Sequence, residues 1–490
     1  MNDPNGMVYD RGEYHLFYQY NPYSNKWGPM HWGHAVSPDM VHWENLPIAL
    51  YPDRIGAIFS GSAVLDVNNT SGFGARANPP LVAIFTFHDH LRENLGETGF
   101  QSQGVAYSLD RGRSWIKYAG NPVLTSPEVR DFRDPKVFWY APDHKWVMTL
   151  AVADHIAFYS SSDLKHWAHE SDFGSGLGSH AGVWECPDLI RLAVQGTSTS
   201  RYVLLVSVGR GGPNGGSATQ YFVGDFDGHR FELVPSQRLK PGAGADAVRN
   251  SQPNDATARW IDYGSDDYAG STWSGGAPGD ERQLFIGWMN NWVYANEVPT
   301  ERWRGAMTVP RELRLVQAER GLEVHSIPIR ELERLRGASL AIPAGSGVRS
   351  MDLTGLAGAK GDLLEMDLSL DVGTADSVEL RFANSNGEST KFRINRSMSR
   401  YEMDRSTSGA VAFNAAFKGL QVAPILGSSQ KLTLKIYLDL SSIEIFVNEG
   451  ETVFTTVVFP SKPYNLVDLK ADQDIVLNAG TIYELRSIWK

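Results

Sequence analysis

The segment SPDMVHW at residues 37–43 decides the fold, because related patterns return further along the chain. It recurs as SLDRGRSW at 108–115 and as SSDLKHW at 161–167, with a weaker copy, GDFDGHRF, at 224–231. The closing aromatic residues are 72, 52 and 64 residues apart, and the chain between them consists largely of short runs rich in β-branched and aromatic residues. Units of this length, built of short strands and tight polar turns, are typical of β-propeller blades.

Counting such units along the chain gives five blades. They cover residues 3–50, 53–120, 131–170, 184–235 and 258–318.

The chain beyond the fifth unit differs in composition and in pattern. Of the 14 tryptophans 13 lie at or before Trp303, and 12 of the 13 histidines precede it. Residues 432–447 alternate between apolar and polar side chains, as in strands of a β-sandwich that bury one face only. We therefore predict an all-β protein with a five-bladed β-propeller catalytic domain at 1–318 and a β-sandwich domain at 338–490. Residues 319–337 should form a linker with a short charged helix at 329–336.

Size and charge restrict the kind of partner. The 490 residues exceed the length at which one hydrophobic core usually stops growing, as expected for two domains. The net charge of -11 is spread without long runs, which argues against a nucleic acid or an anionic membrane surface as partner. No stretch approaches the roughly 20 apolar residues of a membrane span. A single cysteine, Cys186, excludes an internal disulfide. The oligomeric state stays open.

Three acidic motifs share one design. They contain Asp3 in NDPNG, Asp134 in RDP and Glu185 in ECPD. Each carboxylate stands one or two residues before a proline that opens an apolar run, and proline favours an extended preceding residue. Each acid should therefore lie at the start of a strand. Because the innermost strand of every blade lines the propeller axis, acids that open units one, three and four should meet in one axial cavity.

Such a set of acids could support retaining glycoside hydrolysis, which needs an ionised carboxylate and a protonated carboxyl about 5 Å apart. Glu185 stands between Trp184 and Cys186, and this apolar setting should raise its pKa and keep it protonated as the acid. Asp3 is followed by amide and backbone donors and should stay ionised as the nucleophile. Asp134 should accept hydrogen bonds from sugar hydroxyls. Cys186 is disfavoured as a nucleophile because no histidine is close in the sequence.

The residues expected around these acids combine hydrogen-bonding groups with flat apolar faces, which suits a sugar. The predicted substrate-binding residues are Asn2, Gln19, Trp27, Trp32, Phe59, Ser60, Arg133 and Trp292. Arg133 adjoins an acid but could face elsewhere, since neighbouring strand residues point to opposite sides. The polar stretch 88–99 has two open interpretations: a rim loop that shapes subsites beyond the first sugar, or a tolerated surface insertion.

The same motifs resemble glycoside hydrolase family 32, which contains invertases, inulinases, levanases and related fructosyltransferases. The matching segments are MNDPNG at 1–6, HLFYQYNP at 15–22, MHWGHA at 30–35, FSGS at 59–62, RDP at 133–135, WECPDL at 184–189, GGPNG at 211–215, WMNNW at 288–292, PTERWRG at 299–305 and SSIEIF at 441–446. The resemblance implies a five-bladed propeller followed by a β-sandwich, and no metal or organic cofactor. It also implies Asp3 as nucleophile, Asp134 as transition-state stabiliser and Glu185 as acid/base.

The resemblance further implies a retaining enzyme that acts on β-fructofuranosyl linkages of levan, inulin or sucrose through a covalent fructosyl-enzyme intermediate. Two alternatives remain at this stage. One is an intramolecular fructotransferase that releases difructose dianhydride from levan or inulin, and the other is a non-catalytic fructan-binding protein. Because fructan polymers cannot enter a cell unaided, we expect an extracellular protein.

Family members usually carry more residues ahead of the motif that contains Asp3. We therefore expect further residues before Met1 in the natural protein, because an acid so close to a chain terminus would be poorly anchored.

Overall fold

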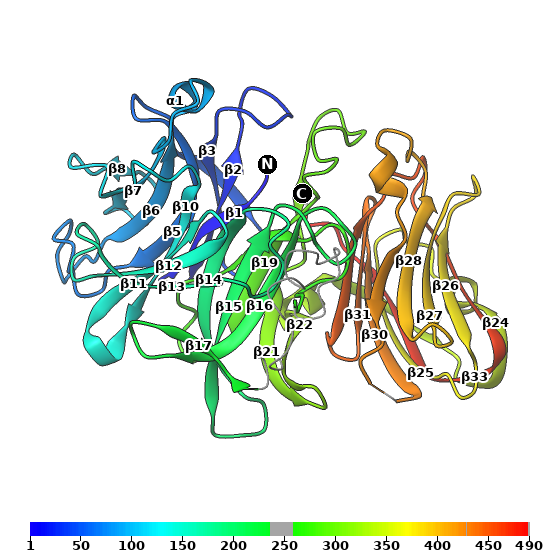
Figure 1. Ribbon diagram of the computed structural model, residues 1–490. Coiled ribbons are helices and arrows are strands. Elements are labelled where there is room, and N and C mark those ends of the chain that lie inside the picture. The colour runs from blue at the N-terminus through cyan, green and yellow to red at the C-terminus, as the bar shows by residue number, and fades with distance from the viewer. Residues whose placement is uncertain (236–257, 428, 489–490) are drawn as a thin grey trace.

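The computed structural model describes residues 1–235, 258–427 and 429–488, and nearly all of its regular structure is β (Figure 1). Residues 489–490, which the sequence assigns to the end of the sandwich domain, lie outside this range. In Figure 1 a propeller occupies the left of the molecule and a stack of long strands the right. Within the described residues, no helix combines the length and the apolar character that a membrane span requires.

Five antiparallel sheets form the propeller. Blade one contains β1 (Pro4–Asp10), β2 (Glu13–Tyr20), β3 (His31–Ser37) and β4 (Glu44–Leu50). Blade two contains β5 (Ala57–Leu65), β6 (Leu81–His88), β7 (Gln101–Ser108), β8 (Ile116–Lys117) and β9 (Leu124–Thr125). Blade three contains β10 (Phe132–Tyr140), β11 (Lys145–Val152), β12 (His155–Ser161) and β13 (Ala168–Phe173). Blade four contains β14 (Trp184–Ala193), β15 (Ser200–Val208), β16 (Ala218–Phe226) and β17 (Phe231–Leu233). Blade five contains β18 (Tyr268–Thr272), β19 (Gln283–Met289), β20 (Ala306–Met307), β21 (Arg311–Ala318) and β22 (Gly321–Pro328).

The first strands of the blades form the inner ring of the propeller. Strands β1, β5, β10, β14 and β18 contact one another in this order, and β18 returns to β1. The ring closes where Val8 pairs with Ser274, just beyond β18. The predicted five-bladed propeller is therefore confirmed, with its blades in the predicted order.

The repeated sequence pattern forms the turn between the third and fourth strands of a blade. In blade three, Ser161 donates to Asp163, whose carboxylate accepts from the backbone N–H groups of Lys165 and His166. The indole N–H of Trp167 then closes the turn on the carbonyl of Leu164 at 3.3 Å. Equivalent bonds occur in blades one and two. The aspartate carboxylate thus accepts hydrogen bonds from backbone N–H groups that have no strand partner in the turn. The tryptophan packs within its blade.

The second body is one sheet of 11 strands folded into two layers. Its elements are β23 (Arg336–Ile342), β24 (Gly345–Asp352), α3 (Leu353–Ala357), β25 (Leu364–Asp371), β26 (Ser377–Ala383), β27 (Ser389–Asn395), β28 (Arg400–Thr407), η4 (Ala415–Lys418), β29 (Gln421–Pro424), β30 (Lys431–Leu438), β31 (Ser442–Val447), β32 (Thr452–Val457) and β33 (Leu466–Leu485). The long strand β33 belongs to both layers, because its residues 466–477 pair with β24 and β26 and its residues 476–485 with β23 and β25. Apolar side chains from both layers share one core, as predicted for a β-sandwich.

The prediction for the connecting region is wrong in part. Residues 319–337 were expected to lack strands, but β22 (Gly321–Pro328) pairs with β21 along its whole length. Only the following segment is a short charged helix, the 3-10 helix η3 (Arg330–Leu335). The strand escaped prediction because its mixed residues alternate weakly, and its pairing with the neighbouring strand determines its conformation.

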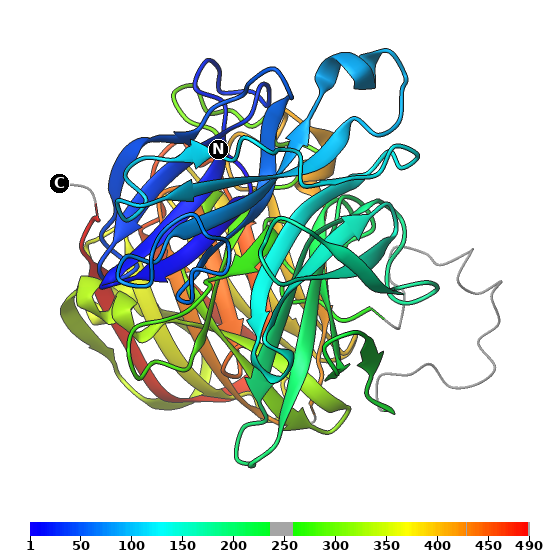
Figure 2. The same ribbon diagram turned by 90° about the vertical axis from the view of Figure 1, so that its left-hand side faces the viewer.

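The sandwich packs against the propeller through β31 and β32. All residues of both strands are buried. On the side facing the propeller, Phe446 and Val453 join a cluster with Trp273 and Leu284 of blade five. The expectation that residues 443–447 bury one face only is therefore wrong, because their second face forms the joint between the two bodies. Figure 2, seen from the propeller side, shows the sandwich strands lying behind the blades.

Candidate active site

The inner strand of every blade carries a β-bulge at the same level. In each strand two residues oppose a single residue of the second strand, at positions 6–7, 59–60, 134–135, 186–187 and 269–270. Gly6, Asp134, Cys186 and Ala269, the first bulge residues of four blades, have positive φ values of 46° to 64°. A bulge turns the strand locally and re-aims its side chains. Five equivalent bulges therefore direct a ring of side chains toward one end of the axis.

The residues just before the bulges include three that touch across blades. They are Arg133, Glu185 and Tyr268, from blades three, four and five. Arg133 donates to Oε1 of Glu185 from Nε at 3.2 Å and from Nη2 at 3.0 Å. The hydroxyl of Tyr268 donates to Oε2. Glu185 is thus held between two donors that occupy equivalent positions in the adjoining blades.

Asp134 is the first residue of the bulge in blade three, and it brings a second acid close to Glu185. Oδ2 of Asp134 accepts from the backbone N–H of Cys186 at 3.1 Å. The thiol sulfur of Cys186 lies 3.6 Å from this oxygen and 3.9 Å from Oδ2 of Asp3. Oδ1 of Asp134 has no hydrogen-bond partner among the residues that the structure describes. Acids of blades one, three and four therefore meet at one end of the axis, as the sequence predicted.

Asp3 is anchored by the neighbouring strand. The backbone N–H of Asn2 donates to the carbonyl of Gln19, and that of Gln19 donates to the carbonyl of Asp3, both at 3.1 Å. These bonds extend the pairing of β1 with β2. The Asp3 carboxylate accepts from Nδ2 of Asn2 at 3.0 Å and from the hydroxyl of Ser60 at 2.9 Å. Asp3 is therefore anchored by contacts within residues 1–60.

Burial dominates the electrostatics of this end of the axis. It raises the pKa of Asp3, which the hydrogen bond from Asn2 opposes and the charge of Glu185 reinforces. Burial also raises the pKa of Asp134 to about 7, against the lowering effect of Arg133. The pKa of the Cys186 thiol is raised well above its ordinary value, again mainly by burial, so the thiol stays protonated. Several acids that compete for ionisation in one place are typical of functional sites.

The expected environments of two of the acids are wrong. Glu185 does not lie in an apolar setting, because its carboxylate accepts hydrogen bonds from Arg133 and Tyr268. Trp184, its neighbour in the sequence, faces the blade core instead. Burial of the Asp3 carboxylate raises its pKa rather than favouring ionisation. Alternation along the strand explains the error, since adjacent side chains point into different surroundings.

Sequence reasoning missed Tyr268. The residue is fully buried at the start of β18, where it is bonded to Glu185. Its segment, Tyr268-Ala269-Gly270, contains neither an acid nor a proline, so the search for acid-proline motifs passed over it. The available signal was its position at the opening of the fifth unit, equivalent to those of the motifs of Asp134 and Glu185.

The predicted polar residues lie close to the acids. Asn2 and Ser60 hold the carboxylate of Asp3, and Arg133 holds that of Glu185. Gln19 is buried, and its side-chain amide donates to the carbonyl of Ile58 at 3.1 Å. The structure therefore shows all four as part of the framework around the acids.

The predicted aromatic residues differ in their exposure. Trp27 is 42% exposed, and its ring meets Phe59 edge to face at 6.0 Å. Trp292 is partly exposed and packs on Trp288. Trp32, by contrast, has no exposed surface, and its indole N–H is bonded to the carbonyl of Phe59. Its expected role as an apolar face for a sugar is therefore wrong, because no side of the ring is open.

Comparison with known proteins shows which family has this sequence and fold. Residues 1–326 match the family model described as glycosyl hydrolases family 32 N-terminal domain, and residues 331–484 match the family 32 C-terminal one. A levanase of Bacillus subtilis is 46% identical over 500 residues, which cover 100% of this chain and 69% of the levanase. An extracellular exo-inulinase, inuE, of Aspergillus ficuum is 39% identical over 488 residues, covering 94% of this chain and 87% of the relative. The crystal structure of an exo-inulinase from Aspergillus awamori superposes with a TM-score of 0.87 at 34% identity, covering 100% of this chain and 96% of that one.

Proposed function

The chain belongs to glycosyl hydrolase family 32, and on this basis we propose that it hydrolyses the β-fructofuranosyl linkages of fructans with retention of configuration. The observation that carries the proposal is the meeting of Asp3, Asp134 and Glu185 at one end of the propeller axis. Similarity to a levanase and to exo-inulinases supports levan and inulin as the substrates to test first, with sucrose as the smallest one.

In the proposed reaction, the carboxylate of Asp3 attacks the anomeric carbon of the terminal fructosyl unit. An ester bond forms to Asp3 while the bond from the anomeric carbon to the leaving oxygen breaks, and Glu185 gives its proton to that oxygen. In the second step Glu185 takes a proton from water. The water oxygen then attacks the same carbon and releases Asp3 as a carboxylate.

The contacts of the three acids support these roles. Hydrogen bonds from Asn2 and Ser60 fix both oxygens of Asp3, and they favour its ionised form against the effect of burial. Arg133 and Tyr268 set the direction of the Glu185 carboxyl group. The Oδ1 atom of Asp134, without a partner among the described residues, is available to accept hydrogen bonds from sugar hydroxyls. Such bonds strengthen as positive charge develops on the ring in the transition state.

We also propose that the protein acts outside the cell. Exo-inulinases among its relatives are named as extracellular, and fructan polymers are too large to enter a cell unaided. The proposal predicts enzyme activity in the culture medium of the organism that makes the protein.

The decisive experiment is product analysis with levan, inulin and sucrose supplied separately. We expect free fructose from each, with glucose in addition from sucrose. The first fructose formed should have the β configuration in early NMR spectra, because two displacements at one carbon retain it. A difructose dianhydride as the main product would instead identify an intramolecular transferase, and no product from any of the three would identify a binding protein.

A matched pair of variants tests the role of the acid/base. Glu185→Gln keeps the size of the side chain but cannot donate or accept the proton, so turnover of every fructoside should fall about 100- to 10,000-fold. Asp154→Asn removes an acid that is 71% exposed in the turn between β11 and β12, and activity should be unchanged. Normal turnover by Glu185→Gln would overturn the assignment.

A further inference from the structure

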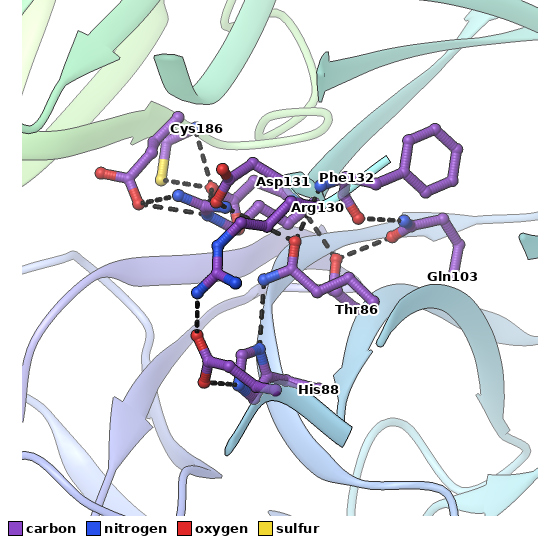
Figure 3. A network of polar contacts seen from close by, with 12 residues as sticks. Thr86, His88, Gln103, Arg130, Asp131, Phe132 and Cys186 are labelled. Carbon is purple, nitrogen blue, oxygen red and sulfur yellow. Dashed lines mark hydrogen bonds and ion pairs between the residues drawn. The ribbon is translucent and has the colours of Figure 1, made fainter. Parts of the chain in front are cut away.

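A row of hydrogen bonds leads from the axial acids to the rim of blade two (Figure 3). Arg133, which holds Glu185, also donates from Nη1 to Oε1 of Gln101 at 3.4 Å. The amide nitrogen of Gln101 donates to Nδ1 of His88 at 3.1 Å. Nε2 of His88 then meets Oε2 of Glu93 at 2.9 Å. The row connects the proposed acid/base with a segment to which the proposed reaction gives no role.

Glu93 belongs to this segment, the rim segment (residues 88–99), which contains the short helix α1 (His90–Asn94). Figures 1 and 2 both show α1 standing out from the edge of the propeller. The second carboxylate oxygen of Glu93 accepts from Arg130 at 3.0 Å, at the approach to β10. Arg92 braces the rim segment from within by donating to the carbonyls of Thr98 and Gly99. The Glu93 carboxylate at the end of the row is 31% exposed but is held between His88 and Arg130.

Each hydrogen bond in the row has a defined donor and acceptor, and the backbone N–H of Phe132 determines which is which. Oε1 of Gln101 accepts from the backbone N–H of Phe132 at 2.7 Å as well as from Arg133. Its NH₂ group must therefore face His88, whose Nδ1 accepts and whose Nε2 carries the proton toward Glu93. Gln101 is 2% exposed and His88 3% exposed, so water does not compete for these bonds. Turning the amide round would place its NH₂ against two other donors.

His88 also packs against the strand that supports Asp3. Its ring stacks on Phe59 with centroids 4.1 Å apart and planes at 9°. Phe59 is followed by Ser60, the hydroxyl of which holds the Asp3 carboxylate. Burial lowers the pKa of His88 to about 4, so its ring is neutral, with a single N–H, above that pH. The histidine is thus fixed in position and in tautomer.

The ligand atoms of His88, His90 and Glu93 lie within 4.8 Å of one another, a spacing that could also suit a metal ion. A metal ion would have to bind Nε2 of His88, because Nδ1 is occupied by Gln101. Metal-bound imidazole carries its proton on the other nitrogen, and here that proton would face the NH₂ group of Gln101. The fixed direction of the row therefore favours hydrogen bonding over metal binding.

We propose that Gln101, His88 and Glu93 are positioning residues, which hold Arg133, and through it Glu185, in the orientation that proton transfer requires. Gln101 grips both the guanidinium of Arg133 and the backbone N–H of the preceding residue, Phe132. His88 and Glu93 hold Gln101 in place from the rim side. This inference rests on the proposed role of Glu185 as acid/base.

The test compares two leaving groups. Sucrose releases glucose, whose leaving oxygen must be protonated, whereas an aryl β-fructofuranoside releases a phenolate that needs less help from an acid. We expect Gln101→Leu to lower kcat/KM on sucrose about 10- to 100-fold and kcat/KM on the aryl fructoside far less. The ratio kcat/KM reports the first displacement, in which the leaving groups differ, whereas kcat also includes the second displacement, which both substrates share. His88→Phe, which keeps the stacking on Phe59 but has no ring nitrogens, should show the same pattern. Equal losses of kcat/KM on both substrates, or an unchanged kcat/KM on sucrose, would overturn the proposal.

Variants on the rim segment provide the controls. Glu93→Leu should reproduce the pattern, whereas Glu93→Gln keeps an acceptor oxygen for His88 and should restore most of the activity. Glu97→Gln removes a neighbouring carboxylate that pairs with Arg92 only, and kcat should not change. Loss of activity in Glu97→Gln as large as in Glu93→Leu would show a general effect of the loop and overturn the proposal.

A double variant separates this inference from the proposed function. If Gln101 acts through Glu185, adding Gln101→Leu to Glu185→Gln should cause no further loss on sucrose. Normal activity of Glu185→Gln alone would overturn the proposed function, whereas an inactive Glu185→Gln with a normal Gln101→Leu would overturn only the positioning role. Titration of the native protein with Zn²⁺ completes the test. One tightly bound zinc per chain that His90→Phe abolishes would overturn the proton assignment, and weak or no binding supports it.

Discussion

Two arginine-centred clusters of buried acids flank the start of β18, and they use their acids differently. Tyr268 reaches Glu185 in the axial cluster, which surrounds Arg133. The preceding residue, Asp267, reaches Arg311 in the junction cluster, where the propeller meets the sandwich. Consecutive residues of an extended chain face opposite sides, so one strand start supplies both clusters.

The junction cluster is closed. Arg311 donates to Asp262 at 2.9 Å, to Asp267 at 3.0 Å and to Glu444 of the sandwich at 2.7 Å. Backbone N–H groups fill further oxygens of these acids, for example that of Thr455 on Asp262 at 2.9 Å. The side chains of the arginine and its three acids are at most 3% exposed. Donors from both bodies thus satisfy most of these acceptors and fix the joint.

The axial cluster is open by comparison. The Glu185 side chain is 20% exposed, and Oδ1 of Asp134 has no partner among the described residues. Burial raises acid pKa values in both places, to about 7 for Asp134 and about 8 for Asp267. The difference teaches that the same residue types form a structural joint when fixed backbone donors fill their oxygens. They form a reactive site when such oxygens stay accessible to an incoming molecule, whereas Oδ1 of Asp267, which has no partner in the junction cluster, is buried.

The largest effect should come from Asp3→Asn, which removes the proposed nucleophile from the open cluster. We expect kcat on inulin and sucrose to fall on the order of 10,000-fold or more, because no ester intermediate can form. The melting temperature should not fall, since burial of the acid costs more than burial of the amide. Steady-state kinetics and thermal unfolding measure the two quantities. A stable variant with normal kcat would show that the open cluster is not the catalytic one.

Next in size is Arg311→Met in the closed cluster. It leaves three buried acids without their common partner and should lower the free energy of unfolding by about 3 to 5 kcal/mol. The kcat of the folded molecules should stay close to that of the native enzyme. Urea unfolding and active-site titration check this pair of expectations. Arg314→Met, on the same strand but 37% exposed and paired with Glu312 alone, is the control and should change little.

The features that could be predicted from the sequence are those formed by contacts between residues close together in the chain. Blade turns were predictable because Asp39, Asp110 and Asp163 form them by local hydrogen bonds within a few residues. Two of the acids were found because Pro135 and Pro187 are the second residues of the bulges that aim them. These signals lie within short segments, so a single sequence reveals them.

The parts that failed depend on contacts distant in the sequence. Trp32 has the composition of a sugar platform, but Phe17 and Phe85 cover its ring. The second buried face of β31 exists only because blade five lies against it. Tyr268 acquires its role from Glu185, 83 residues away. Hydrophobic pattern indicates which residues are buried, but it does not show which distant segment covers them.

A smaller effect should appear in the pH dependence of stability. The folded-state pKa of Asp134, about 7, lies above its ordinary value of 3.8, so the native protein binds a proton there that the unfolded chain releases. Stability is therefore lost as the pH rises from about 4 to 7, by up to about 1.4 kcal/mol per unit. Asn cannot titrate, so Asp134→Asn should gain in melting temperature over the native protein between pH 5 and pH 8. A constant difference across this range would contradict the burial argument.

The smallest effect, a loss of kcat of about 10- to 100-fold, is expected for Arg133→Lys. Lysine keeps the positive charge beside Asp131 but lacks the planar fork, so it cannot donate to Glu185 and Gln101 together. Because the charge remains, the melting temperature should fall much less than in Arg311→Met. Kinetics on inulin and thermal unfolding of both variants, measured side by side, sharpen the comparison. If Arg133→Lys lost as much stability as Arg311→Met while keeping its kcat, Arg133 would be a structural joint as well. The distinction between an open and a closed cluster would then fail.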